Sequence, residues 1–439
     1  MSAISVDLII KPRWLIPVVP HNQVLEKCAV VIDRGEIVAV VPNSEADNRY
    51  SAKQEIELLE HALIPGLVNA HGHCAMTLLR GYADDYPLHT WLNEHIWPAE
   101  SKWVNTRFVQ DGTELAIAEM IRSGTTCFAD MYFYPEIAAE VTSKVGMRAQ
   151  IAFPVMDFPT NWAGSADEYI HKGLAVRDQV KGNDLVHIAF GPHAPYTVSD
   201  KPLEKIATYS EELGTPVHIH LHETAGEVAE QIEKTGVRPT QRLQSLGLMS
   251  PLTQCVHMTQ IDNTDIQVLR DSGAHVVHCP ESNLKLASGF CPVQKLLDNG
   301  INVALGTDGA ASNNDLSMFG EMRTAAMLAK AVASDAAALN AHQTLRMATL
   351  NGANALGLGD KIGSIEAGKA ADLVAVQLSE LETLPMYNPV SQLVYTDNSH
   401  RVSHVWVNGK ALLSDRKLTT LDQVEVMHKA RQWAGKIAG

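Results

Sequence analysis

The strongest constraint on the fold is a repeated alternation in the middle of the chain. Eight apolar, β-rich runs recur there, each followed by a helix-like segment such as Val109–Arg122, Lys201–Leu213 or Thr264–Asp271. Apolar strands that alternate with helices predict an α/β fold with a parallel sheet covered by helices. Eight such units in about 300 residues predict a closed (β/α)8 TIM barrel. The runs are 62–73, 125–131, 148–155, 186–195, 216–223, 253–260, 275–282 and 302–310.

An open doubly wound sheet is the alternative to the barrel. Such a sheet would favour a G-x-G-x-x-G motif after the first strand, and none follows it here. The closed barrel is therefore our prediction for the middle of the chain.

The two ends of the chain share a different, purely β character. Hairpin signals occur at Arg34-Gly35 and at Asn408-Gly409, each between β-branched runs. We predict one small β-sandwich domain built from both termini, residues 1–63 and 366–439, beside a barrel domain of residues 64–365. The stretch from Leu421 to Ile437 has a helical pattern.

Composition and charge narrow the class of protein. A chain of 439 residues is long enough for a large domain and a smaller one. The formal net charge of -15 argues against nucleic acid as a partner, because an acidic surface repels phosphates. No run of about 18 apolar residues occurs, so we expect no membrane span.

Cysteine usage favours a reducing compartment. None of the six cysteines forms a C-x-x-C pair, which argues against a thiolate metal site. The apolar run near the N-terminus is interrupted by Lys11, Pro12 and Arg13, so a strand fits it better than a secretion signal. We therefore expect a cytoplasmic protein.

Polar side chains gather where the predicted barrel strands end. In barrel enzymes this is the end of the sheet at which active sites form, and burying polar groups there is costly unless they are used. The candidates are His71, His73, His193, His220, Glu223, His257 and Asp308.

The H-x-H pair at the end of the first run points to a metal. Residues two apart on a strand share a face, so His71 and His73 should both point into the barrel. With His220 and Asp308 from other strands they would form a nitrogen-rich site with an open position. That ligand set suits zinc or iron.

The fifth run contains three histidines, each of which is a candidate for the third histidine ligand. His218, His220 and His222 have the same parity, so all three could face inward. We expect His218 to lie deeper in the core and His222 at the rim. His220 is then the middle choice, with Glu223 just past the strand end.

Together these motifs resemble the amidohydrolase superfamily across essentially the whole chain. PGLVNAHGH is similar to its strand-one motif and GTDGAASNND to its strand-eight motif. Within the superfamily, HGHCAMTLLRGYADDYPLHTWLNEHIWPAE and the H-x-x-E spacing of His220 and Glu223 resemble the 5'-methylthioadenosine/S-adenosylhomocysteine deaminases.

The resemblance implies a role for each matching residue. His71, His73, His220 and Asp308 match the ligands of one divalent ion, with zinc the first choice and iron an alternative. Glu223 matches the carboxyl that protonates N1 of the purine. Asp308 would accept the proton of the attacking water, and His257 would contact that water. Glu100 matches a partner of the ribose hydroxyls, and substrate contacts are also implied for His193, Glu223 and Asp308.

Two absences refine the expected reaction. The fourth strand run, VHIAFGPHAP, contains no lysine that could bridge two metals, which favours one ion and deamination over cyclic amide hydrolysis. The loop after the third strand, within residues 152–166, has no arginine or lysine to bind an amino acid carboxylate. Arg148 precedes that strand and should lie at the wrong end of the barrel.

The same loop is apolar and aromatic. Phe153, Phe158 and Trp162 suit a thiomethyl group, which predicts methylthioadenosine as a better substrate than S-adenosylhomocysteine. Adenosine is a further possible substrate. We also expect a homo-oligomer, and Trp91 and Trp97 could form a lid over the substrate or a subunit contact.

Rival interpretations share the metal site. A guanine or pterin deaminase or a triazine hydrolase would keep the ligands but would not need Glu100, because only a riboside has hydroxyls to bind. A non-catalytic scaffold would be expected to lose metal ligands, and all of them are present. The cytidine-deaminase type of zinc site is excluded because P-C-x-x-C is absent.

Overall fold

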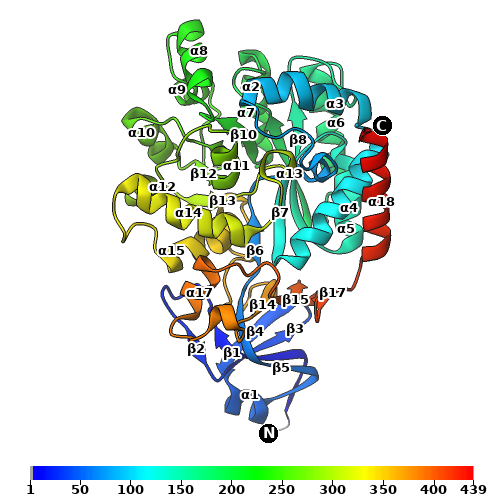
Figure 1. Cartoon of the computed structure of the whole chain (residues 1–439), viewed down its shortest axis with the longest axis vertical. Helices are drawn as coiled ribbons and strands as arrows, with labels where there is room; N and C mark the ends of the chain where they lie inside the picture. Colours follow the sequence, from blue (N-terminus) through cyan, green and yellow to red (C-terminus); the bar gives the residue numbers. More distant parts are fainter. Residues whose placement is uncertain (1–2, 439) are drawn as a thin grey trace.

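The structure, a computed structural model, describes residues 3–438 and contains two separate sheets (Figure 1). One is an eight-stranded parallel sheet surrounded by helices, and the other is a nine-stranded mixed sheet built from both ends of the chain. The prediction of a (β/α)8 barrel with a β domain from both termini is confirmed.

The parallel sheet follows chain order from β6 to β13. Its edge strands meet through two backbone hydrogen bonds, Ala70 N to Leu305 O at 2.9 Å and Asp308 N to His71 O at 3.0 Å. These bonds close the barrel beside the predicted metal ligands. The strands are β6 Leu67–Asn69, β7 Thr125–Met131, β8 Arg148–Val155, β9 Val186–Pro192, β10 Val217–Leu221, β11 Thr253–His257, β12 His275–His278 and β13 Val303–Leu305.

Helices between the barrel strands pack their apolar faces on the sheet. The three predicted helices lie within α4, α7 and α10, and Asn105 caps α4 by accepting from the amides of Arg107 and Phe108. The main helices of this layer are α4 Thr106–Arg122, α5 Pro135–Val145, α6 Ala166–Gln179, α7 Asp200–Leu213, α8 Ala225–Thr235, α10 Asn263–Ser272 and α14 Met318–Ala333.

Shorter helices complete the chain. They include α1 Asn43–Arg49, α2 Leu88–Thr90, α3 Trp97–Trp103, α9 Pro239–Ser245, α11 Pro280–Lys285, α12 Val293–Asp298, α13 Ala310–Asn313, α15 Ala341–Arg346, α16 Gly352–Ala355 and α17 Pro389–Tyr395. Of these, α2 and α3 follow the H-x-H motif and cover the end of the barrel that carries it (Figure 1).

The mixed sheet joins the two termini through β5, which pairs with β1 on one side and β14 on the other. Both predicted hairpins form, β3 with β4 and β15 with β16. Residues from both halves, among them Ile10, Leu63 and Trp406, share one buried cluster. The strands are β1 Ile4–Leu15, β2 Leu25–Glu26, β3 Cys28–Asp33, β4 Glu36–Pro42, β5 Tyr50–Pro65, β14 Leu373–Gln377, β15 Val402–Val407, β16 Lys410–Ser414 and β17 Lys417–Leu418.

A buried ion pair joins the barrel to the mixed sheet. Arg148, the first residue of β8, donates from Nε to Asp372 Oδ2 at 2.9 Å, and both side chains are almost fully buried. Since barrel sites form where strands end, Arg148 lies at the opposite end of its strand from the histidines. It is thus committed to the domain junction and cannot serve as a substrate clamp.

The C-terminal helix α18, Gln423–Ala438, lies along the barrel beside α4 (Figure 1). Trp433 Nε1 donates to Asp111 Oδ2 at 3.0 Å, and Lys429 pairs with Glu114 at 2.7 Å. Our division of the chain groups residues 366–439 with the β domain, and within that range the buried face of α18 contacts the barrel helix α4. The domain boundaries stay a prediction. Among residues 3–438, no helix is both long and apolar enough to cross a membrane.

Candidate active site

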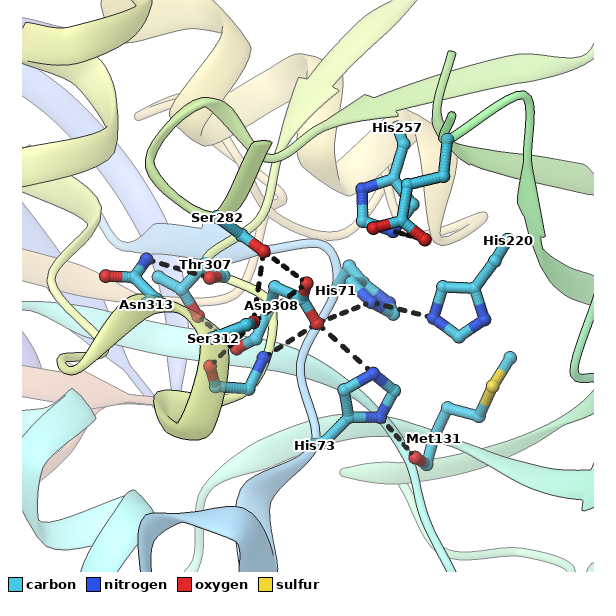
Figure 2. A network of polar contacts seen from close by, with 12 residues as sticks. His71, His73, Met131, His220, His257, Ser282, Thr307, Asp308, Ser312 and Asn313 are labelled. Atoms are coloured by element: carbon cyan, nitrogen blue, oxygen red, sulfur yellow. Dashed lines mark hydrogen bonds and ion pairs between the residues drawn. The ribbon is translucent and has the colours of Figure 1, made fainter. Parts of the chain in front are cut away.

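Four histidines and one aspartate converge at the carboxyl end of the barrel strands (Figure 2). Their ligand atoms form two overlapping groups, each with all atoms within 4.8 Å of one another. One group holds His71, His73 and Asp308, and the other holds His71, His220 and His257. The structure therefore brings together every metal ligand expected from the sequence, with His257 beside them.

The H-x-H pair lies just beyond its strand. β6 ends at Asn69, so His71 and His73 stand on an extended segment that follows the sheet. The end of β13 approaches this segment closely, and a Cβ at Gly306 would lie 2.7 Å from the His71 nitrogen. A glycine is needed there for Asp308 to reach the histidines.

The distances within the cluster are short. His71 Nε2 lies 3.3 Å from Asp308 Oδ1, and His73 Nε2 lies 3.2 Å from the same oxygen. His71 Nε2 and His220 Nε2 are 3.3 Å apart. Figure 2 shows the Asp308 carboxylate facing both His71 and His73.

Backbone carbonyls fix the tautomers of two of these histidines. His73 Nδ1 lies 2.6 Å from the carbonyl oxygen of Met131, and His220 Nδ1 lies 2.7 Å from that of His193. A carbonyl can only accept, so each Nδ1 carries the proton and donates it. Each Nε2 therefore presents a lone pair to the cluster.

A buried chain of side chains fixes the tautomer of His71 in the same way. Gln254 Nε2 donates to the carbonyl of Ala355 at 2.7 Å, so its Oε1 faces His218 and accepts from His218 Nδ1 at 2.6 Å. His218 Nε2 is then an acceptor, and His71 Nδ1 donates to it at 2.7 Å. His71 Nε2 is consequently a lone pair as well.

The residues present fit a cation. Lone pairs of His71 and His220 face each other at 3.3 Å, with the Asp308 carboxylate beside them, in a place shielded from water. This arrangement is repulsive unless a positive charge lies between the groups. Three neutral imidazoles and one carboxylate form a donor set that suits zinc or iron.

Hydroxyl groups hold the Asp308 carboxylate. Ser282 Oγ donates to Oδ2 at 2.7 Å and Ser312 Oγ at 3.1 Å, while the Gly309 amide donates to Oδ1 at 2.8 Å (Figure 2). Asp308 itself has a left-handed φ of 62°. Sequence reasoning missed both serines, although Ser312 stands inside the GTDGAASNND motif.

Glu223 is buried next to His257. Its Oε2 is 3.8 Å from His257 Nε2, and its Oε1 accepts from Ser288 Oγ at 3.4 Å. Burial raises the pKa of the Glu223 carboxyl well above its ordinary value, and the nearby Asp308 and Glu227 charges raise it further. Burial thus favours the protonated form of this carboxyl.

The other two histidines of the fifth strand run differ from each other. His218 points inward and deeper, in contact with His71. His222 lies beyond the end of β10 with a φ of 54°, and its ring contacts the Gln260 carbonyl and the Thr240 amide. The shared parity expected for the three histidines therefore ends at Leu221, where the strand ends.

Glu100 lies in α3 and is buried. Its Oε1 accepts a hydrogen bond from the Tyr132 hydroxyl at 2.7 Å. Burial raises the pKa of Glu100 to about 7, partly opposed by that bond. Tyr132 immediately follows β7, and nothing in the sequence pattern had singled it out.

A cavity of about 90 Å³ connects these groups. Its lining includes two of the expected ligands, His73 and Asp308, together with His193, Glu223 and Glu100. Trp91 and Trp97 both form part of its wall. A larger cavity of about 610 Å³ lies between α4, α14 and α18 and contains none of the clustered histidines.

The three aromatic residues expected to surround a thiomethyl group, Phe153, Phe158 and Trp162, differ in their surroundings. Phe153 is fully buried against Phe190, and Trp162 packs on Tyr169, so both stabilise the loop. Phe158 faces a second cavity. Sequence reasoning missed further apolar residues of that wall, among them Phe133 and Met156.

Comparisons with known proteins agree with this site. A profile of the amidohydrolase family matches residues 62–412. The chain is 55% identical to a protein of Teredinibacter turnerae over 99% of this chain and 98% of that one. It is 56% identical to a protein of Saccharophagus degradans over 98% of this chain and 97% of that one. Both relatives are named 5-methylthioadenosine/S-adenosylhomocysteine deaminase.

A solved structure resembles the whole chain. A zinc-bound adenosine deaminase of Xanthomonas campestris superposes with a TM-score of 0.98 at 50% identity, covering 100% of both chains. Sequence profile, relatives and fold agree over nearly the full length. The chain therefore belongs to the amidohydrolase family and, within it, to the group that contains the 5-methylthioadenosine/S-adenosylhomocysteine deaminases.

Proposed function

We propose that this protein is a metal-dependent hydrolytic deaminase of adenine nucleosides. The observation that carries the proposal is one cavity lined by two buried carboxyls, Glu223 beside the histidine cluster, with a raised pKa, and Glu100. The first suits a purine ring and the second suits ribose hydroxyls. The names of the relatives and of the zinc-bound structure support the same reaction.

We propose His71, His73, His220 and Asp308 as the ligands of one divalent ion, with zinc the first choice and iron an alternative. When bound, such an ion supplies Lewis acidity that makes water a good nucleophile near neutral pH. The hydrogen bonds at each Nδ1 orient the imidazoles, and Ser282 and Ser312 hold the carboxylate.

Three side chains would manage the protons. Glu223, neutral because it is buried, donates a proton to purine N1 and so makes C6 electrophilic. Asp308 accepts the proton from water, and His257 orients that water. A C6–O bond forms, and Asp308 passes the proton from water to the amino group. The C6–N bond then breaks, the nitrogen leaves as ammonia, and the proton of the new C6 hydroxyl returns to Glu223.

Two further residues would bind the nucleoside. Glu100 accepts hydrogen bonds from the ribose hydroxyls, with its carboxyl held by Tyr132. His193 lies at the cavity wall, its Nδ1 3.0 Å from Thr197 Oγ1, and contacts the substrate through its ring. Free guanine, pterins and triazines have no ribose hydroxyls for Glu100, which disfavours these alternative substrates.

We propose methylthioadenosine as a better substrate than S-adenosylhomocysteine. No arginine or lysine lines either the inner cavity or the second cavity beyond Glu100. Arg148 is bound to Asp372 at the other end of the barrel. A substrate carboxylate would therefore lose its hydration without gaining a charged partner.

The test is ammonia release from metal-replete protein with methylthioadenosine, S-adenosylhomocysteine, adenosine and guanine. We expect release from the adenine nucleosides, with methylthioadenosine the best and guanine inactive. No release from any adenine nucleoside would refute the function. Equal kcat/KM for methylthioadenosine and S-adenosylhomocysteine would refute only the preference.

The cellular setting is a secondary part of the proposal. All six cysteines are free thiols, and five of them are buried, which suits a reducing cytoplasm. We also propose that the protein is a homo-oligomer. Its molar mass in solution, measured by light scattering on the purified protein, tests this.

A further inference from the structure

The cavity of about 610 Å³ lies where the barrel helices α4 and α14 meet α18 and the turn between β16 and β17. Three arginines line it: Arg122 ends α4, Arg323 stands in α14, and Arg416 lies in the turn. Elements far apart in the sequence thus each bring a guanidinium group to one space. None of the residues that line this arginine-lined cavity also lines the inner cavity, so it is separate from the nucleoside site.

Unpaired arginines are concentrated in this cavity. Of the sixteen arginines in the chain, eleven form ion pairs with carboxylates. Five have no such partner within residues 3–438, and Arg122, Arg323 and Arg416 are three of these five. A bound anion would supply the negative charge that the protein itself does not place beside them.

Two of the guanidinium groups are held beside each other. Arg416 Nη1 donates to the Arg122 carbonyl at 2.8 Å, and Arg122 Nη1 donates to the Arg416 carbonyl at 3.1 Å. Their other acceptors are also uncharged, namely two further carbonyls and Gln423 Oε1. Burial lowers the pKa of Arg416, and the charge of Arg122 lowers it further.

This arrangement leaves donors free for a ligand. Within the described chain only Nη1 of Arg122 and of Arg416 donates, so the Nε and Nη2 groups have no protein acceptor. Like charges in a partly buried place repel each other, and an anion that accepts from both side chains removes that repulsion.

The carboxyl groups of the cavity do not neutralise these arginines. Glu119 is paired with Arg80, and Asp397 accepts from a serine hydroxyl and amide in its own turn at 2.8 and 3.1 Å. Burial raises the pKa of Glu281 and of Asp315, which favours their uncharged forms. The charge left without a partner is therefore mainly that of the arginines.

The rest of the wall is largely apolar. It includes Leu115 of α4, Met327 of α14, and Val426 and Met427 of α18. Met327 and Met427 are 48% and 40% exposed, so they present apolar surface that no other side chain covers. The volume lies in the range of sites for small organic molecules and exceeds what an inorganic ion needs.

We propose that this cavity binds a small organic anion, with a phosphate or carboxylate group at Arg122, Arg323 and Arg416 and an apolar body against the methionine wall of α14 and α18. Guanidinium groups bind both kinds of head group through paired N–H···O bonds. The ligand is distinct from the nucleoside substrate, because the two cavities share no residue.

The first experiment titrates the zinc-loaded full-length protein with phenyl phosphate, benzoate, inorganic phosphate and phenol in a calorimeter. We expect phenyl phosphate or benzoate to bind most tightly, and their order identifies the preferred head group. Inorganic phosphate lacks the apolar body and phenol lacks the charge, so both should bind more weakly. Equal affinity for phenol, or no binding of either organic anion up to about 10 mM, would overturn the proposal.

The second experiment locates the bound anion by substitution. Arg323 is exposed and has no hydrogen bond or ion pair within residues 3–438, so Arg323→Gln should leave folding and ammonia release unchanged. Hydrogen bonds to charged groups contribute strongly to binding, so affinity for phenyl phosphate should fall by about tenfold in Arg323→Gln and in Arg122→Gln. Because Arg122 also bonds to Gln423 of α18, Arg323→Gln keeps the test valid if Arg122→Gln loosens that helix.

Arg431→Gln is the matched control. Arg431 is an exposed arginine of α18 that also lacks a carboxylate partner in the described chain, but it does not line the cavity. Its loss changes the net charge equally and should leave the affinity at the wild-type value. Wild-type affinity in all three variants would place the anion elsewhere, such as at the metal, and an equal fall in all three would show only an effect of net charge. Either result would overturn the proposal.

Discussion

The histidine cluster and the second cavity lie on either side of Glu100, yet they are held together by different forces. At the cluster, directional hydrogen bonds fix nearly every polar group, as at His73 with the Met131 carbonyl and His220 with the His193 carbonyl. In the second cavity, Trp97 and Phe158 are placed by packing. Chemistry requires direction, whereas recognition of an apolar group requires mainly shape.

This difference sets the expected size of mutational effects. A substitution at the cluster removes a side chain whose orientation is fixed by hydrogen bonds and whose role no neighbouring residue can take over. Its effect on the rate should therefore be large for every substrate. A change around the ribose or in the second cavity should depend on the substrate. Substitutions at the cluster should therefore slow all substrates, and substitutions away from it only some.

The largest effect is expected for Asp308→Asn. The amide keeps the shape of the side chain but removes the negative charge that faces His71 and His73. We expect little bound metal after dialysis, and a fall in ammonia release of at least about 1,000-fold, since Lewis-acid assistance contributes several kcal/mol. Metal content by atomic absorption and the rate are measured on the same sample.

Ser312→Ala is the control for this change. It removes one of the two hydroxyls that donate to Asp308 Oδ2 but leaves the carboxylate and Ser282 in place. Metal should be retained, with a modest loss of rate. Full activity of metal-replete Asp308→Asn would contradict the assignment of Asp308.

Glu223→Gln should lower turnover strongly without affecting the metal. Glutamine cannot supply the proton that the buried carboxyl holds, and general acid catalysis contributes about 100- to 10,000-fold. Metal content should equal that of the wild type. If the metal were lost together with activity, Glu223 would have to be a ligand and its proton-transfer role would be wrong.

The sequence was sufficient for the barrel and for the residues of the cluster, because strand alternation and strand-end position are both visible in residue order. His71, His73 and Asp308 follow from that pattern. His220 had to be chosen among three histidines, and the structure separates them by depth and by the end of β10 at Leu221.

The supporting contacts could not be predicted from the same pattern. The carbonyls of Met131 and His193 are backbone groups, which leave no signal in the type of side chain. Gln150 and Gln254 meet across 104 positions of sequence. An amphipathic period likewise shows that α18 buries one face but does not show that α4 covers it.

Gln254→Met tests whether the buried chain behind His71 matters for the metal. Methionine keeps the volume but replaces the oxygen that accepts from His218 Nδ1, so the tautomer of His218, and through it that of His71, is no longer fixed. We expect metal affinity, measured by competition with a chelator, to fall by about 10- to 100-fold. The melting temperature of the metal-free protein separates this effect from general destabilisation.

Gln150→Met is the matched control, because Gln150 contacts Gln254 at 2.8 Å and neither histidine. It removes a hydrogen bond of similar burial but leaves the contact between Gln254 and His218. A smaller loss of metal affinity is expected. Equal losses in the two variants would mean that the chain serves packing alone.

The smallest and most selective effect is expected for Tyr132→Phe. Its hydroxyl donates to Glu100 Oε1 at 2.7 Å, so its loss leaves the carboxyl free to turn away from the ribose. One such hydrogen bond is worth about 1 kcal/mol, or roughly fivefold in kcat/KM for adenosine. With 2',3'-dideoxyadenosine, which has no hydroxyls for Glu100, the wild type and the variant should react alike. A general disturbance of the nearby Met131 carbonyl and His73 would slow both substrates equally, so the ratio of the two rates distinguishes positioning of Glu100 from damage to the cluster.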